Sequence, residues 1–210
     1  MQTLERFEIT DPTQPKPETN LNHHRIYGHV LCPFVQRVLI TAYLRNFEYQ
    51  LVEIDLTEKA DWHKEVNGGL VPILEQPDGT LTPESDVVAN WIFDNTDSGP
   101  NLYPNDRDET KQVVDKYFGI AIAGLISVIR ERNSAGPKVK AALDKFEEEF
   151  PDSDYLEGAE SFTMADIFVW PFLHFSAALE GSAMHDVFEE ASLWTHPKTF
   201  AWYKRCLSNF

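Results

Sequence analysis

The chain has 210 residues, of which 42% are hydrophobic and 25% are charged, an ordinary composition for a globular protein. Its 34 acidic residues outnumber its 18 Lys and Arg residues, which gives a formal net charge of −16. A surface this acidic repels phosphate backbones and anionic lipid headgroups, so nucleic acid and membranes are poor candidate partners.

Cys32 and Cys206 are too few for a disulfide framework, and no basic segment followed by an apolar run indicates a secretory signal. The longest apolar stretch, residues 118–129, is shorter than the roughly 20 residues that cross a bilayer. We therefore expect a cytoplasmic protein. His23 and His24 are adjacent, so their side chains diverge and no metal site is predicted.

Residues 1–22 are polar and contain three closely spaced prolines, Pro12, Pro15 and Pro17. They show little periodicity. We expect an extended tail that precedes the folded domain.

The pattern of residues 23–97 predicts an α/β unit of thioredoxin size. Proline suits the first position of a helix, so a helix is expected to begin at Pro33. The predicted elements are a strand at 25–27, that first helix, a strand at 49–54, a short helix at 58–66, a strand at 71–75, a turn at 77–79, a return strand from Thr80 and a helix at 84–93. Their order mixes parallel and antiparallel pairing.

Residues 98–107 are rich in Gly, Pro and Asn and are predicted to be a linker. Residues 108–210 then read as an all-helical domain, with helices at 108–132, 137–149, 163–179, 184–192 and 196–207. Thr163 and Asp166 have the spacing of a capping box, in which each side chain bonds the backbone of the other residue. The box uses Asp where Glu is commoner.

Cys32 is the first candidate for chemistry, because it lies where the predicted strand ends and the helix begins at Pro33. Unpaired backbone N–H groups and the helix dipole at such a junction stabilise a thiolate, which is the nucleophile for disulfide exchange. The alternative is a buried structural thiol, the usual fate of a single cysteine. Val35 occupies the place of the second cysteine of a dithiol motif, so a redox cycle would need a thiol from a cosubstrate. We expect Cys206 to be structural or inert.

Three further features would suit a small peptide ligand. Val71 precedes Pro72 at the start of a strand, where a bend can offer the Val71 backbone to an extended peptide, although an ordinary trans proline stays open. Glu84 and Ser85 begin a helix, where Ser85 is either an anion site or a plain cap. Lys59 alone could be a solvated lysine. Together these residues match the ammonium, carboxylates and backbone of glutathione, whose thiol would face Cys32.

The sequence resembles the omega class of glutathione transferases over about residues 24–175. The residues that carry the resemblance are Arg25-Ile26-Tyr27, Cys32-Pro33-Phe34 followed by Arg37, Lys59 with Trp62, residues 69–75, Glu84-Ser85-Asp86 and residues 161–171. The resemblance implies a thioredoxin-like N-terminal domain followed by an all-α helical bundle domain, usually in a dimer.

It also implies a catalytic cysteine at Cys32 and glutathione binding through Phe34, Lys59, Val71-Pro72, Glu84 and Ser85. The implied chemistry is glutathione-dependent thiol transfer, such as reduction of dehydroascorbate or of mixed disulfides, on a small electrophilic or oxidised substrate. Residues from Ser176 onward match no family pattern, so the second substrate stays open.

Two other classes remain open at this stage. Chloride intracellular channel proteins share a Cys-Pro-Phe start, and some relatives are regulatory or structural modules without turnover. Fold alone does not decide among them. The complete set of Cys32, Lys59, Val71, Glu84 and Ser85 favours an enzyme.

Overall fold

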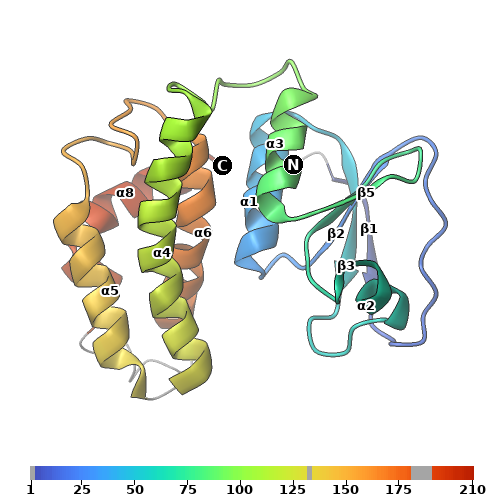
Figure 1. The fold of residues 1–210 in the computed structure, drawn as a ribbon, viewed down its shortest axis with the longest axis horizontal. Coiled ribbons are helices and arrows are strands. Elements are labelled where there is room, and N and C mark those ends of the chain that lie inside the picture. The colour runs from blue at the N-terminus through green and yellow to red at the C-terminus, as the bar shows by residue number, and fades with distance from the viewer. Residues whose placement is uncertain (1–2, 132–133, 181–190) are drawn as a thin grey trace. The chain divides into compact units, whose positions relative to one another are not determined.

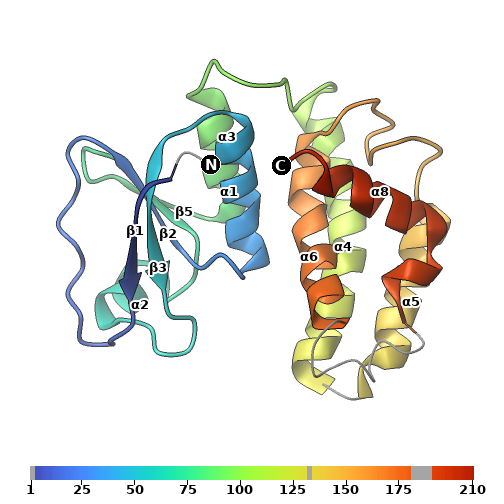
Figure 2. The same ribbon diagram turned by 180° about the vertical axis from the view of Figure 1, so that it is seen from behind.

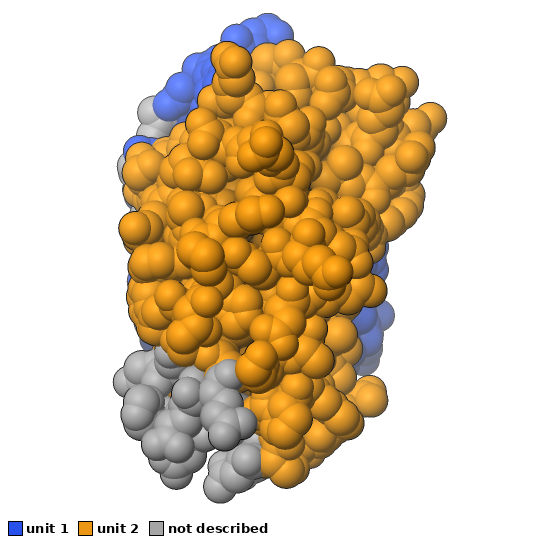
Figure 3. Space-filling model, turned by 90° about the vertical axis from the view of Figure 1, so that its left-hand side faces the viewer, with its two compact units in different colours: residues 1–100 blue, residues 101–210 orange. Residues whose placement is uncertain are grey.

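The structure is a computed structural model that describes residues 3–131, 134–180 and 191–210 (Figure 1). The chain divides into two compact units, Met1–Pro100 and Asn101–Phe210, coloured blue and orange in Figure 3. This division falls within residues 98–107, the segment that the sequence predicts as a linker.

Unit 1 is built on a five-stranded mixed sheet of order β1-β3-β2-β4-β5 (Figure 1). Its strands are β1 (Thr3–Ile9), β2 (His24–Gly28), β3 (Tyr49–Ile54), β4 (Ile73–Glu75) and β5 (Leu81–Pro83). Its helices are α1 (Pro33–Leu44), α2 (Asp61–Asn67) and α3 (Ser85–Asp94). β1 and β2 run parallel to β3, while β4 is antiparallel to both β2 and β5. The predicted thioredoxin-like order of elements from β2 to α3 is confirmed.

Neighbouring residues of the sheet serve opposite faces, because side chains alternate along a strand. Ile26 and Leu51 pack in one buried cluster with residues of α1 and α3. Their neighbours Tyr27 and Val52 pack in a second cluster with Ala60 and Trp62, at the start of α2. Helices α1 and α3 therefore cover one face and α2 lies on the other, as both ribbon views show (Figures 1 and 2).

The expectation that residues 1–22 precede the folded domain as a tail is wrong, because Thr3–Ile9 forms the edge strand β1. The strand pairs in parallel with β3, with Ile9 opposite Ile54. Ile9 is 2% exposed, whereas Leu4 and Phe7 are 44% and 38% exposed. An edge strand with one deeply buried apolar residue carries no alternating pattern, which is why the sequence does not reveal it.

Unit 2 is all-helical, with α4 (Arg107–Glu131), α5 (Gly136–Glu149), α6 (Met164–Glu180), the 3₁₀ turn η2 (Leu193–Thr195) and α8 (Pro197–Leu207). Helix α4 packs along both α5 and α6 (Figure 2). These four helices confirm the predictions for 108–132, 137–149, 163–179 and 196–207 to within about a residue at each end. The helix predicted at 184–192 lies, apart from its last two residues, outside the described residues.

The predicted capping box at the start of α6 is confirmed. The Thr163 N–H and hydroxyl both donate to Asp166 Oδ2, at 2.9 Å and 2.8 Å, and the Asp166 N–H approaches Thr163 Oγ1 at 3.5 Å. The other carboxylate oxygen, Oδ1, accepts from Leu156 N at 3.1 Å and from Trp202 Nε1 at 2.7 Å. The buried carboxylate of Asp166 therefore connects α6 to α8 and to the loop that precedes α6.

Helix α4 is longer than its apolar stretch suggests. By length and composition alone it could cross a membrane, with a mean hydropathy of 1.5 over 18 residues, a third of them buried. Core helices of soluble proteins pass the same test, and α4 packs between α5 and α6, so this single helix is weak evidence for a span.

Candidate active site

Four connections of unit 1 meet at one edge of its sheet. β2 and β3 are parallel and end side by side, with Gly28 opposite Glu53. The antiparallel β4 begins at Ile73, opposite Tyr27 near the end of β2, and β5 ends at Pro83, opposite Ile73. The segments that carry Cys32, Lys59, Val71 and Glu84 therefore leave from, or arrive at, the same edge. In open α/β sheets, ligands bind at the carboxyl ends of the parallel strands, which is this edge.

Cys32 is the N-cap residue of α1 and is partly exposed. Its side chain makes no cap hydrogen bond, Pro33 follows at the first helical position, and the Cys32 N–H is held by His29 O at 2.8 Å. The thiol therefore lies at the positive end of a 12-residue helix, and no side-chain cap competes for its first N–H groups. The place of a second thiol is taken by Val35, which is fully buried against Gly28.

Arg37 connects the Cys32 helix to the start of α3. Its side chain is buried, donates from Nη1 to Ser85 Oγ at 3.2 Å, and lies 5.3 Å from the ring centre of Phe34. Burial lowers the pKa of Arg37 to about 10, while the negative charges of Asp86 and of a Cys32 thiolate oppose that shift. The nearby negative charges therefore help to keep the buried guanidinium protonated.

Glu84 and Ser85 begin α3, as predicted. Glu84 is the exposed N-cap residue, and its backbone lies in the left-handed region, with φ 70° and ψ 124°. Ser85 is only 5% exposed, and Arg37 donates to its hydroxyl. The two residues therefore present different groups: a carboxylate in solvent, and a hydroxyl beside the first N–H groups of the helix.

Lys59 precedes α2, which begins later than the prediction of 58–66 because Ala60 is its N-cap residue. The Lys59 side chain lies along Gly69, whose φ is +74°. A Cβ at Gly69 would come within 2.9 Å of Lys59 Cδ, so glycine leaves room for the lysine there. The end of α2 agrees with the prediction, because Gly68 caps it in the left-handed conformation at φ 58°.

Val71 and Pro72 are joined by a cis peptide bond, which resolves the alternative that the sequence leaves open. Val71 lies two residues before Ile73, the first residue of β4 that pairs with β2. Two side chains hold the preceding loop at the carbonyl oxygen of Leu70. This oxygen accepts a hydrogen bond from Asn67 Nδ2 at 3.2 Å and lies 2.8 Å from His63 Nε2. The Val71 backbone is thus fixed beyond the end of the paired strand, where an added peptide strand can meet it.

Trp62 is a residue whose role sequence reasoning does not assign. Within the described residues, its indole Nε1 is buried and has no hydrogen-bond partner. Trp62 packs against the cluster that also receives Val71, and it follows Lys59 by three residues. The sequence signal for Trp62 is its place in the motif with Lys59. The buried, unsatisfied indole N–H is visible only in the structure. An indole N–H in that position can donate to a bound acceptor.

Cys206 does not belong to this group. It lies in α8 of unit 2 and is fully buried, and burial raises its pKa, with the charge of Asp166 adding to the rise. A buried neutral thiol is a poor nucleophile. Among the described residues, no cluster of three His, Cys, Asp or Glu side chains could hold a metal ion.

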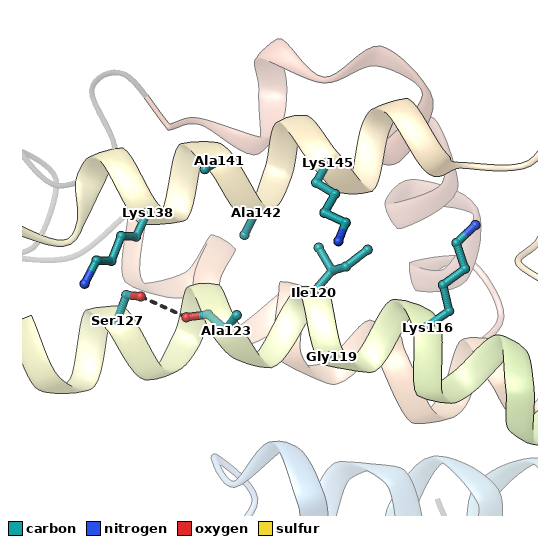
Figure 4. A pocket seen from close by; sticks show the side chains of 9 residues that line it. All are labelled: Lys116, Gly119, Ile120, Ala123, Ser127, Lys138, Ala141, Ala142 and Lys145. Atoms are coloured by element: carbon teal, nitrogen blue, oxygen red, sulfur yellow. Dashed lines mark hydrogen bonds between the residues drawn. The ribbon is translucent and has the colours of Figure 1, made fainter.

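A groove of about 490 Å³ lies between α4 and α5 in unit 2 (Figure 4). Its floor is apolar and includes Ile120, while Lys116, Lys138 and Lys145 project around it (Figure 4). Each lysine already has a carboxylate partner: Lys138 pairs with Glu131, and the other two lie 3.3 Å and 3.8 Å from Glu149. The groove contains none of the predicted site residues, all of which belong to unit 1.

Two family profiles match the sequence. Residues 26–100 match "Glutathione S-transferase, N-terminal domain", and residues 129–205 match "Glutathione S-transferase, C-terminal domain". The chain belongs to the glutathione S-transferase family. Glutathione is the cosubstrate of this family, and the resemblance inferred from the motifs is confirmed.

Curated relatives include omega-1 enzymes. The chain is 30% identical to glutathione S-transferase omega-1 of Sus scrofa over 193 residues, covering 87% of this chain and 78% of that one. It is 33% identical to glutathione S-transferase L1 of Arabidopsis thaliana over 208 residues, covering 93% and 82%. Among solved structures, glutathione transferase E6 of Drosophila melanogaster has a TM-score of 0.69 at 22% identity, covering 88% and 86%. That likeness supports the fold.

Proposed function

We propose that this chain is an omega-like glutathione transferase that acts as a thiol transferase and dehydroascorbate reductase, with Cys32 as its catalytic nucleophile. The observation that carries the proposal is the position of Cys32 as the N-cap residue of α1, with no side-chain cap hydrogen bond, followed by Pro33 and without a second thiol at Val35. Family members that conjugate glutathione need only a hydrogen-bond donor at this place. A cysteine there supplies a nucleophile that forms its own disulfide.

The site residues fit glutathione as the cosubstrate. Glu84 offers an exposed carboxylate to the ammonium group, and Ser85 with the start of α3 offers donors to the γ-glutamyl carboxylate. Val71 offers backbone groups to the central peptide, and Lys59 offers its ammonium to the glycine carboxylate. The unpartnered Nε1 of Trp62, three residues after Lys59, is a further donor for that carboxylate.

Phe34, in the first turn of α1, and Pro72, at the bend before β4, complete the proposed glutathione site. Phe34 is partly buried and carries the Arg37 guanidinium against its ring. Pro72 is buried and fixes the direction of the Val71 backbone. Both would shape the pocket by packing, since neither side chain has a polar group to offer.

The proposed reaction has two disulfide exchanges. The Cys32 thiolate attacks the glutathionyl sulfur of a mixed disulfide, the old S–S bond breaks, and the leaving thiolate takes a proton from solvent. Cys32 now holds glutathione through a new S–S bond. A second glutathione thiolate attacks the glutathionyl sulfur, and oxidised glutathione and the Cys32 thiolate leave. With dehydroascorbate, two glutathione molecules supply the two electrons and two protons that form ascorbate.

Initial rates with hydroxyethyl disulfide and dehydroascorbate test this proposal. Cys32→Ser should abolish both activities, because an alcohol is a poor nucleophile at neutral pH and cannot form the disulfide. Cys206→Ser is the matched control and should keep them. Mass spectrometry after treatment with oxidised glutathione should find one adduct, on Cys32. The proposal fails if Cys32→Ser retains most of its activity or if Cys206→Ser loses it.

We also propose that the chain acts in the cytoplasm as a homodimer, as glutathione transferases generally do. Its two cysteines are free, which fits a reducing compartment. The net charge of −16 disfavours binding to nucleic acid and to anionic membranes. Light scattering on the purified chain checks the oligomer, and a monomeric mass would refute that part. The second substrate is proposed only as a small electrophilic or oxidised molecule.

A further inference from the structure

The N-terminal arm, residues 3–22, contacts two of the segments that present proposed glutathione residues: the start of α2, after Lys59, and β4, after Val71 and Pro72. Its strand β1 lies at the sheet edge, and the ribbon views show the following segment on the same side of the sheet as α2 (Figures 1 and 2). No feature of the sequence assigns this arm a role. Its strand pairs with β3, and side-chain bonds join the arm to Arg25, Gln50 and Glu53. Two further groups of contacts reach the start of α2 and β4.

The first group supplies a missing helix cap. Helix α2 has only seven residues, and its N-cap residue is Ala60, which has no side chain to accept from the first N–H groups. The carbonyl of Pro12 accepts from the Asp61 N–H at 3.0 Å and takes over that task. An Asx turn holds Pro12 in place, because Asp11 Oδ1 accepts from Thr13 N and Thr13 Oγ1, both at 2.8 Å.

The second group reaches Glu75, the last residue of β4, which is 1% exposed. Lys16 forms an ion pair with Oε1 of Glu75, and Thr19 Oγ1 donates to the same oxygen at 3.0 Å. The other oxygen accepts from Tyr27 Oη at 2.8 Å. Arg25 Nη1 also lies 3.6 Å from that oxygen, so Lys16 and Arg25 together compensate the buried carboxylate. Lys16 thereby holds the arm on β4, three residues after Pro72.

The two groups share one apolar base. Ile9, the last residue of β1, is buried in the same cluster as Ala60, and Trp62 and Val71 pack against that cluster. The arm thus touches the lysine-bearing side of the proposed pocket through α2 and its peptide-binding side through β4. It makes no such connection to Cys32, which begins a helix on the opposite face of the sheet.

We propose that the N-terminal arm is a positioning element of the glutathione pocket, holding α2 with Lys59 and β4 with Val71 in their binding arrangement. The inference rests on the proposed function. Loss of the arm's contacts should weaken glutathione binding while the intrinsic reactivity of Cys32 stays the same. A general loss of folding would change both.

The experiment uses the full chain with Lys16→Ala, the conservative Lys16→Arg, and Lys111→Ala as control, because Lys111 pairs with Asp115 on the exposed surface of α4. Lys16→Ala should raise the KM for glutathione about three- to tenfold, the loss of one partly buried charged contact. Lys16→Arg and Lys111→Ala should stay near wild type. The alkylation rate of Cys32 by iodoacetamide should change less than about twofold in all three.

Hydrogen–deuterium exchange gives a readout that needs no glutathione. Lys16→Ala should speed exchange of the α2 amides, and Asp11→Ala should do the same, whereas Asp11→Asn keeps the Asx turn and should not. Exchange in α3 should not change. Wild-type exchange in α2 in both alanine variants would overturn the proposal, as would a wild-type KM for Lys16→Ala. If the wild-type chain does not use glutathione, the proposed function fails, while the exchange result still decides the role of the arm.

Discussion

Arg37 and Ser85 join the helix that begins at the candidate nucleophile to the helix that begins at the candidate anion site. The guanidinium Nη1 of Arg37 donates to Ser85 Oγ at 3.2 Å, and both side chains are buried, at 5% exposure. A hydroxyl that accepts from Arg37 directs its own proton elsewhere. Arg37 therefore orients Ser85 as a donor toward the start of α3, where a ligand carboxylate would lie.

Arg37→Met should raise the KM for glutathione about tenfold, because hydrogen bonds to charged groups contribute about 1.5–3 kcal/mol. Stability should change less, because the acidic neighbour Asp86 is exposed and stays solvated when the guanidinium is removed. Arg37→Lys keeps the charge but loses the planar fork, so we expect an intermediate KM. Steady-state kinetics and thermal unfolding check this. A fall in Tm that tracks the loss of activity would show that Arg37 is only structural.

Glu84→Gly should separate binding from stability. The φ of 70° at Glu84 is strained for any residue with a Cβ, at about 1–3 kcal/mol. Glycine relieves that strain. It also costs about 0.5–1 kcal/mol of stability, because the unfolded chain gains conformational entropy, so stability should hold or rise on balance. The KM for glutathione should rise nevertheless, because the carboxylate proposed to pair with the ammonium is lost.

Glu84→Ala is the matched variant, since it removes the carboxylate and keeps the strained backbone. It should show the same rise in KM without any gain in stability. Urea unfolding and steady-state kinetics measure the two effects separately. Unchanged KM values in both variants would remove Glu84 from the proposed site.

Local signals explain why the order of elements from β2 to α3 is predictable. Pro33 begins α1 and Gly68 ends α2, and each acts through its own backbone conformation. The assignment of residues to the two faces of the sheet follows from the alternation of side chains along β2 and β3. None of these signals depends on a distant partner.

Features that depend on distant partners escaped sequence reasoning. β1 is a strand only because β3 is beside it, and the start of α2 depends on the carbonyl of Pro12 rather than on a capping side chain. The position of Arg37 in the motif was visible, but its contact with Ser85 spans 48 residues of sequence. The candidate residues were predictable as a set, whereas the connections that orient them required the fold.

Asp166 should make the stability of the folded chain depend on pH. Burial raises its pKa from 3.8 to about 6, although four donors favour its ionised form. Because the folded pKa is the higher one, the stabilising contribution is complete below about pH 4 and is lost as pH rises through about 6. The shift corresponds to at most about 3 kcal/mol. Asp166→Asn cannot titrate, so it should lack this part of the dependence.

Urea unfolding of both proteins at about pH 4.5 and about pH 7.5, on either side of the raised pKa, measures the difference. The substituted side chain would also present its amide to donors, which costs stability at both pH values, so the comparison is the change with pH and not the absolute value. The other carboxyl groups titrate alike in both proteins and cancel. An identical pH dependence in wild type and Asp166→Asn would show that Asp166 does not titrate as described.

Gly99 and Gly79 share a φ of +86° but differ in what surrounds them. A Cβ at Gly99 would lie 1.9 Å from the Leu44 carbonyl oxygen at the end of α1, whereas one at Gly79 would meet only Thr19 Oγ1 at 3.9 Å. Gly79→Ala should therefore cost about 1–2 kcal/mol, the penalty of a left-handed residue. Gly99→Ala should cost about 3 kcal/mol or more, because the backbone must also move. That movement would disturb Arg45, which donates to Pro100 O at 2.8 Å and to Thr96 Oγ1 at 3.1 Å. Urea unfolding of the two variants side by side isolates the steric term, and equal losses would show that the close approach to Leu44 is absent in solution.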